Sequence, residues 1–164
     1  MTQFEQIYRD NFDCVYAYIF RLSGDKHIAE EITSETFFKA LKAIDSFRGD
    51  CEIRVWLCQI AKNCYYSYSG KKQKLTSLDE QTQLTDESSN PEEEIINKDD
   101  AARIRNALHH IPEPYKEVFM WRVFAEMSFR QIGQMFKKSE NWACVTYHRA
   151  RKMILERMEE NDNE

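Results

Sequence analysis

The last third of the chain carries residue types suited to reading duplex DNA. Between Lys137 and Lys152 there are five basic residues against Glu140 alone, a local net charge of +4. Cations of this kind neutralise phosphates, while amide, imidazole and apolar groups contact base edges in a groove. If the segment is a helix, one face presents the candidate DNA-contacting residues Asn141, Trp142, Cys144, Val145, His148, Arg149 and Lys152, with Cys144 at its edge.

Two helices joined by a tight turn are predicted to position this face. Ser128 is a good N-cap for a helix to residue 135, residues 136–138 form the turn, and Ser139 caps a last helix to about residue 158. This is the helix-turn-helix pattern. An amphipathic helical hairpin with a solvated basic face would produce the same spacing. The predicted buried stripe of the last helix is Ala143, Tyr147, Ala150 and Ile154.

A second group of residues combines cations and aromatic rings in the middle of the chain. Rings with cations on one helix suit unpaired bases of a single strand. The alternative is that some rings, Trp56 above all, belong to the core. The group comprises Arg48, Arg54, Trp56, Lys62, Tyr65, Tyr66, Tyr68, Lys71, Lys72 and Lys74.

A third group is the polar face formed by Glu31, Ser34 and Glu35 on a predicted helix over residues 27–45. Composition alone favours a solvated helix surface, but an acidic face beside an apolar stripe could also dock a basic partner. The predicted inward residues of this helix are Ile28, Ile32, Phe37, Leu41 and Ile44.

No pattern in the sequence predicts catalysis. There is no Gly-rich phosphate loop, no H-E-x-x-H and no nucleophile elbow, so neither an enzyme nor a small-molecule substrate is expected. The five cysteines are odd in number and no pair has C-x-x-C spacing, which argues against a metal site and against a disulfide framework. We expect no cofactor.

Composition predicts an all-α chain of two small domains. Gly and Pro are scarce, and no apolar run approaches the roughly 20 residues that span a bilayer, so a cytoplasmic protein is expected. The net charge of −5 is unevenly distributed: residues 75–100 carry −8, and the rest of the chain carries +3. We therefore predict a helical domain over 1–74, a flexible acidic linker over 75–100 and a second helical domain over 101–160.

Three stretches of the chain resemble the extracytoplasmic-function (ECF) group of the sigma-70 family. The run LSGDKHIAEEITSETFFKALKAIDSFRGD is similar to that group's region 2, and VWLCQIAKN to the helix that follows it. The run ALHHIPEPYKEVFMWRVFAEMSFRQIGQMFKKSE, with RARK after it, resembles region 4. The two signatures stand in the family's order and cover nearly the whole chain outside the acidic segment.

The resemblance implies a transcription initiation factor that binds core RNA polymerase and promoter DNA. It implies polymerase docking by Glu31, Ser34 and Glu35, and reading of the −35 element as duplex by the last helix. It further implies a membrane-linked anti-sigma factor as partner. Capture of an unpaired base of the −10 element is carried over to Phe47, Arg48, Gly49, Asp50 and Asn63.

Two positions depart from the family pattern. Family members usually carry Gln where this chain has Ser34, and many carry Arg or Lys where it has Cys144. Because a thiol adds neither charge nor a strong hydrogen bond, the last helix is expected to bind duplex DNA more weakly. The alternative function is a free-standing helix-turn-helix regulator that binds operators as a dimer; it would bind duplex alone, whereas a sigma factor needs core polymerase.

Overall fold

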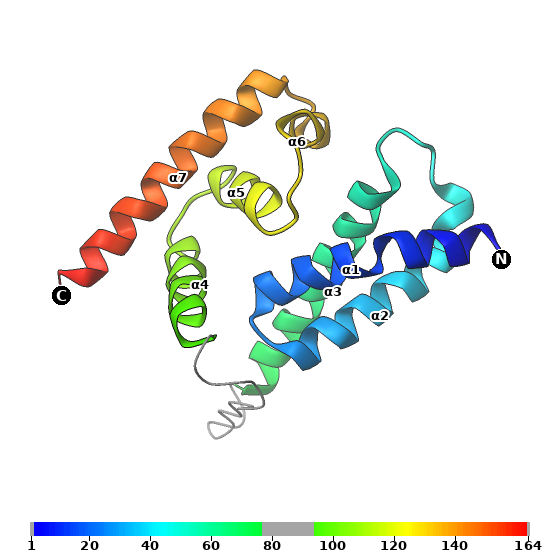
Figure 1. Ribbon diagram of the computed structural model, residues 1–164, viewed down its shortest axis with the longest axis horizontal. Helices are drawn as coiled ribbons and strands as arrows, with labels where there is room; N and C mark the ends of the chain where they lie inside the picture. Colours follow the sequence, from blue (N-terminus) through cyan, green and yellow to red (C-terminus); the bar gives the residue numbers. More distant parts are fainter. Residues whose placement is uncertain (1, 77–93, 164) are drawn as a thin grey trace.

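The computed structural model describes residues 2–76 and 94–163. Within these ranges the regular structure is helical: seven α-helices and one short 3-10 helix, without a strand (Figure 1). The helices form a three-helix unit followed by a four-helix unit. The predicted all-α fold of two small helical domains is therefore confirmed. Residues 77–93, the centre of the predicted acidic linker, lie outside the described residues.

The first unit is a bundle of α1 (Gln3–Ser23), α2 (Lys26–Ala43) and α3 (Ile53–Thr76). Gly24 ends α1 in the left-handed region with φ 69°, a conformation that costs glycine little. The next residue, Asp25, caps α2, since its side chain accepts hydrogen bonds from two backbone N–H groups of the first turn. A sharp α1–α2 connection follows, and it sets the two helices side by side (Figure 1).

The buried face of α2 differs from the predicted one. The buried residues follow spacings of three and four from Ala29 to Ala40, so Leu41 stands about 100° away from that stripe and is 51% exposed. The inward placement of Leu41 was wrong, and Ile28 and Ile44 are half-buried rather than central. Short side chains pack α2 closely against its neighbours. The buried residues are Ala29, Ile32, Thr33, Thr36, Phe37 and Ala40.

The second unit consists of α4 (Glu94–Leu108), α5 (Tyr115–Val123), α6 (Phe129–Phe136) and α7 (Glu140–Asp162). The long helix α7 packs against each of the other three (Figure 1). At its far end Asp162 accepts two hydrogen bonds from Arg103 of α4, at 2.6 and 2.7 Å.

Three helix ends lie beyond their predicted positions. Helix α3 continues past Gly70 to Thr76, because one glycine costs only about 1 kcal/mol in a helix and the Lys and Gln residues after it are good helix formers. Helix α4 begins at Glu94, inside the predicted linker. Helix α7 extends to Asp162.

The two units contact each other mainly through α5 and the segment that follows it (Figure 1), and Arg105 of α4 donates to the carbonyl of Arg21 at 3.2 Å. Trp121 of α5 is 1% exposed and its ring stacks on Tyr18 of α1, with 5.3 Å between centroids. Arg21 Nη1 donates to the carbonyl of Phe124 at 2.7 Å, and Lys62 forms an ion pair with Glu117. The contact therefore combines one buried aromatic pair with a border of charged groups.

Candidate nucleic-acid and partner interfaces

The turn between α6 and α7 is tight and locally specified. Ser128 forms a capping box with Gln131 at the start of α6. A Cβ on Gly133 would lie 2.7 Å from the carbonyl oxygen of Ser139, so only glycine allows the two helices to approach this closely. Lys137 closes α6 in the left-handed region, φ 57°, and Ser139 caps α7. The predicted helix-turn-helix geometry is present.

The inward face of α7 matches its predicted stripe with one change. Ala143, Ala150 and Ile154 are buried as expected, and Thr146 is buried in addition. Tyr147 was expected in the core but is half-buried, with its ring stacked on Phe119 at 5.9 Å. The buried stripe is centred between positions 146 and 147, as a period of 3.6 residues requires.

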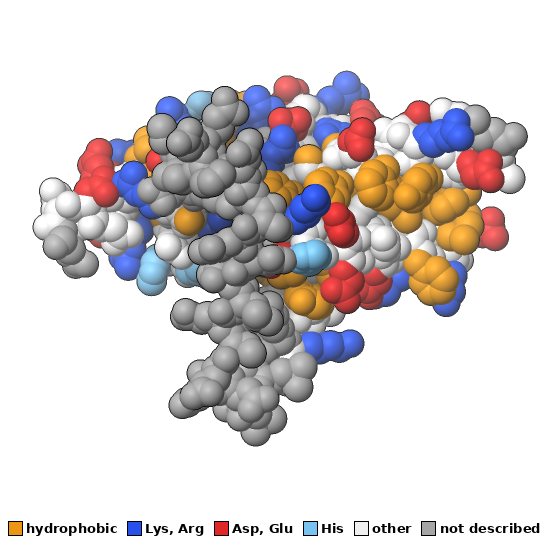
Figure 2. Space-filling model, turned by 60° about the horizontal axis from the view of Figure 1, so that its bottom comes forward, with side chains coloured by type: hydrophobic (Ala, Val, Ile, Leu, Met, Phe, Trp, Pro, Cys, Tyr) orange, Lys and Arg blue, Asp and Glu red, His pale blue; other side chains and the backbone are white. Residues whose placement is uncertain are grey.

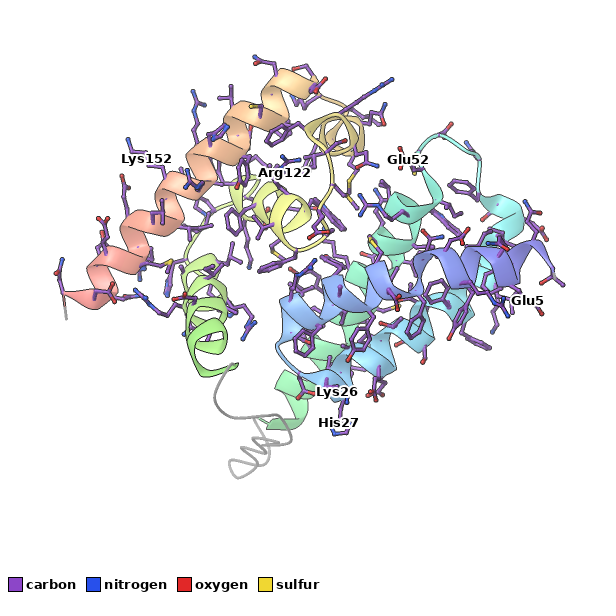
Figure 3. All side chains as sticks on the ribbon, viewed as in Figure 1. Glu5, Lys26, His27, Glu52, Arg122 and Lys152 are labelled. Carbon is purple, nitrogen blue, oxygen red and sulfur yellow. The ribbon has the colours of Figure 1, made fainter. Side chains whose placement is uncertain are left out.

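The outward face of α7 collects most of the predicted DNA-contacting residues. Asn141, Val145, His148, Arg149 and Lys152 are exposed on one side of the helix, and Figure 3 shows Lys152 projecting away from the rest of the molecule.

The other two residues predicted for this face are half-buried. Trp142 packs against Phe136, with 5.3 Å between ring centroids, and Cys144 lies at the flank of the face. The exposed part of this surface holds an amide, an imidazole, an aliphatic group and two cations. This composition suits groove contacts combined with phosphate contacts.

The loop before α3 and Asn63 lie on one side of the first unit. Phe47 is half-buried and packs against Trp56 at 5.0 Å, so the expected core role of Trp56 is met in part. Asn63 follows Trp56 by seven residues, which is the same helix face about 10 Å further along, and it is exposed. Residue 49 has φ 77°, where glycine is favoured. Arg48, Gly49 and Asp50 are exposed.

Three members of the basic and aromatic group contact the second unit. Arg54 Nη1 donates to the carbonyl of Ala125 at 2.8 Å. Lys62 pairs with Glu117, and the Tyr66 hydroxyl lies 3.8 Å from the sulfur of Met120. Burial raises the pKa of Tyr66 to about 12. The polar ends of these side chains are therefore used in the contact between the units.

The face around Glu31 is larger and more apolar than the sequence analysis predicted. Glu31 and Ser34 are exposed, while Glu35 is half-buried and forms an ion pair with Lys39 at 3.2 Å. Sequence reasoning missed the apolar members of this face, although positions i+7 and i+10 from Glu31 would have identified them. They are Phe38, 58% exposed, and Leu41, 51% exposed.

Hydrophobic side chains of α1 and α2 gather on one face of the molecule (Figure 2). Tyr8 and Phe20 of α1 are 41% and 42% exposed. Large apolar patches on a surface mark interaction sites more often than chance, and here charged residues border the patch. We call the surface formed by Glu31, Ser34, Glu35, Phe38 and Leu41 the α2 surface.

Two family models match the chain in separate segments. Sigma-70 region 2 matches residues 7–75, and Sigma-70, region 4 matches residues 101–154. The two matches cover the two helical units. The chain belongs to the sigma-70 family. Region 2 followed by region 4 is the order of a small alternative sigma factor, a protein that directs promoter-specific transcription initiation.

Curated relatives place the protein in the ECF group. RNA polymerase sigma factor YlaC of Bacillus subtilis is 27% identical over 98% of this chain and 94% of its own length. ECF RNA polymerase sigma factor SigW of Bacillus subtilis is 25% identical over 93% of this chain and 85% of its own length. The sigma factor thus corresponds to nearly the full length of these relatives.

Solved structures share the fold of the sigma factor. The sigma factor RpoE from Bartonella quintana, in complex with the anti-sigma factor NepR, aligns with TM-score 0.68 at 18% identity, over 97% of this chain and 98% of that chain. CnrH, in complex with the cytosolic domain of CnrY, aligns with TM-score 0.62 at 17% identity, over 92% and 84%.

The described residues contain no group of three or more His, Cys, Asp and Glu side chains that could hold a metal ion. None of the helices in the described part of the chain is long and apolar enough to cross a membrane.

Proposed function

We propose that the sigma factor docks on core RNA polymerase through the α2 surface. The exposed rings and aliphatic groups of Phe38 and Leu41 supply apolar area, and Glu31 supplies charge at its edge. A centre of apolar groups within a charged rim is the usual composition of a protein interface. Ser34, which replaces the usual Gln of the family, adds a short hydroxyl to the same surface.

The −10 element is proposed to bind the Phe47–Asp50 loop and Asn63. The Asn63 side chain is exposed, and its amide offers two donors and an acceptor to the edge of an unpaired base. Arg48, exposed in the same loop, supplies a cation for the backbone of the strand. Asn63 stands about 180° around α3 from Arg54, which contacts the second unit, so a strand can approach Asn63 without breaking the Arg54 contact.

The −35 element is proposed to bind as duplex to the outward face of α7. The whole proposal rests on the presence of two unlike surfaces on separate helical units. One is the helix-turn-helix with Arg149 and Lys152 exposed, and the other is the face of α3 that carries Asn63, next to the Phe47–Asp50 loop. A repressor needs only the first surface. A sigma factor needs both, together with a docking surface for polymerase.

An anti-sigma factor, linked to the membrane, is proposed as the regulatory partner. Two solved structures with this fold are described as complexes, one with the anti-sigma factor NepR and one with the cytosolic domain of CnrY. The exposed apolar residues of α1 and α2 provide area for such a partner. A pull-down from native lysate tests this proposal, and recovery of polymerase alone under all conditions would count against it.

Run-off transcription with core polymerase on a promoter library tests the function. The full-length sigma factor should direct transcripts from a defined promoter class only when core polymerase is present, and Phe38→Ser should abolish them by preventing assembly. Lys26→Ser, a change at an exposed residue outside the three proposed surfaces, is the control. Tight binding of palindromic duplex by the protein alone, without transcripts, would instead identify a dimeric regulator.

A further inference from the structure

Two thiols and a guanidinium meet between α1 and α3. Cys14 lies half-buried on α1, and Cys58 is fully buried on α3, one turn after Arg54. Arg54 Nη1 donates to Cys14 Sγ at 3.2 Å, and the Cys58 thiol lies close enough to this sulfur to change its pKa. None of the three residues belongs to a surface assigned to DNA or polymerase, so their arrangement is unexplained by the proposed function.

The environment concentrates negative charge on one of the two sulfurs. The neighbouring Cys58 thiol, together with the hydrogen bond and charge of Arg54, lowers the pKa of Cys14 to about 6, against burial and Glu126, which raise it. The interaction with Cys14 and burial raise the pKa of Cys58 well above its ordinary value. Cys14 is thus a thiolate near neutral pH, the form of cysteine that reacts with electrophiles, and a protonated thiol lies beside it.

The guanidinium of Arg54 also holds the second unit. It donates to the carbonyls of Ala125 at 2.8 Å and Glu126 at 3.2 Å, in the connection between α5 and α6. The Cys14 thiolate, Arg54 and this connection therefore form one continuous network across the contact between the units. A change in the charge of Cys14 alters the partner that balances Arg54.

We propose that Cys14 is a hydroperoxide-reactive thiol, that Cys58 closes a disulfide with it, and that this reaction loosens the Arg54 contact with the second unit. The Cys14 thiolate attacks one peroxide oxygen: an S–O bond forms, the O–O bond breaks, and the departing alkoxide or hydroxide takes a proton from water. The sulfur is oxidised by two electrons to a sulfenic acid, and the peroxide is reduced.

The neighbouring thiol completes the reaction. Cys58 sulfur attacks the sulfenic sulfur, the S–O bond breaks, and the proton of Cys58 leaves with the hydroxide as water. The disulfide carries no charge, so the half-buried Arg54 loses its anionic partner. A guanidinium without a counter-charge is better solvated by water, which favours its withdrawal from the carbonyls of the α5–α6 connection.

Cys51 provides a matched control within the same chain. It is half-buried like Cys14, but burial and the neighbouring acids Asp50 and Glu52 raise its pKa. Alkylation of the full chain by iodoacetamide, followed residue by residue by mass spectrometry, should reach its maximal rate at Cys14 by about pH 7. The rate at Cys51 should still be rising at pH 9. Profiles of the same shape would overturn the assignment of Cys14 as the reactive thiol.

Hydrogen peroxide should then produce a Cys14–Cys58 disulfide within one chain, with the loss of two thiols. In Cys58→Ala the reaction should stop at a sulfenic acid on Cys14, which dimedone traps; in Cys14→Ala neither product should form. Failure to find this disulfide in the folded wild-type chain would overturn the proposal. An equal yield of disulfides that contain Cys51 would also overturn it.

Hydrogen exchange tests whether the disulfide loosens the Arg54 contact with the second unit. Oxidation of the wild-type chain should raise amide exchange in the 124–131 segment severalfold, and peroxide treatment of Cys14→Ala should leave it unchanged. Unchanged exchange in a chain shown to be fully disulfide-bonded would refute the link.

Discussion

Asn63 and Arg54 lie on the same helix and point in opposite directions. Nine residues of α-helix correspond to two and a half turns, so the two side chains stand about 180° apart. Arg54 donates to backbone carbonyls of the second unit, and Asn63 remains exposed. Single substitutions in α3 should therefore separate contacts between the units from contacts with DNA.

Asn63→Ala is expected to impair promoter opening while leaving assembly with core polymerase intact. The change removes the hydrogen bonds proposed for an unpaired base, at a cost of about 1–3 kcal/mol, which corresponds to roughly 5- to 150-fold less open complex. Permanganate footprinting of the −10 element measures it. Lys26→Ser, at an exposed residue of α2 outside the proposed surfaces, is the control. An unchanged footprint would remove Asn63 from the −10 site.

Stability should depend on pH through Cys14. The folded chain lowers the pKa of this thiol from 9.0 to about 6, so its stabilising contribution is complete above about pH 9, declines as the pH falls and is lost below about pH 6. Its size is on the order of 1 kcal/mol, because water screens a half-exposed group. Urea unfolding of the wild-type chain and Cys14→Ser at pH 6 and pH 9 measures it. Parallel pH profiles would contradict the lowered pKa.

Cys144→Arg is expected to strengthen duplex binding across all sequences. Cys144 stands at the flank of the outward face of α7, and a cation there adds one phosphate contact. The slope of log affinity against log salt should steepen by about one unit, whereas Arg149→Ala should weaken binding and relax base preference if Arg149 reaches a guanine edge. Holoenzyme titrated with matched and scrambled −35 duplexes measures both. If Cys144→Arg changes neither affinity nor slope, residue 144 does not face DNA.

At the scale of the elements, local sequence signals were sufficient to predict the helix-turn-helix. Ser128 and Ser139 are side-chain caps, and the apolar period of α7 fixes its buried face to within one residue. Leu41 was misplaced because apolar character alone does not distinguish a core stripe from a docking surface on the adjacent face. The contact of Arg54 with the second unit could not be predicted, since two of its partners there are main-chain carbonyls, and these leave no signal in the sequence.

Gly133→Ala should destabilise the second unit by about 1–3 kcal/mol. The new Cβ would lie 2.7 Å from a backbone oxygen of the α6–α7 turn, and backbone cannot move aside as a flexible side chain does. Gly70→Ala is the control: its Cβ meets nothing within 4 Å and the change removes a helix-destabilising glycine, so it should stabilise α3 by about 0.5–1 kcal/mol. Thermal unfolding measures both. A stable Gly133→Ala chain would show that the turn can relax.

At the scale of the whole molecule, the two reading surfaces are carried by units whose contact is small and partly charged. Tyr18 and Trp121 form the apolar centre, and ion pairs and main-chain hydrogen bonds surround it. Contacts between domains of this composition resemble transient protein interfaces, so relative motion of the units is the default expectation. A partner that binds at this contact therefore competes with these interactions and changes how the two units are placed.

Lys62→Glu should separate the two units without unfolding either. Lys62 and Glu117 are each about three-quarters buried, with side-chain exposures of 26% and 28%, and Trp121 Nε1 donates to the same Glu117 carboxylate at 3.3 Å. Reversing one charge places two carboxylates together beside the buried ring, at a cost of roughly 2–4 kcal/mol. The radius of gyration from small-angle scattering should rise while far-ultraviolet circular dichroism stays constant.

Lys39→Glu, which disrupts the exposed pair with Glu35 on α2, should change neither quantity. The double exchange Lys62→Glu with Glu117→Lys should restore the compact form at least in part, because it re-creates an ion pair of opposite polarity. A radius of gyration unchanged by Lys62→Glu would mean that the contact between the units does not depend on this pair.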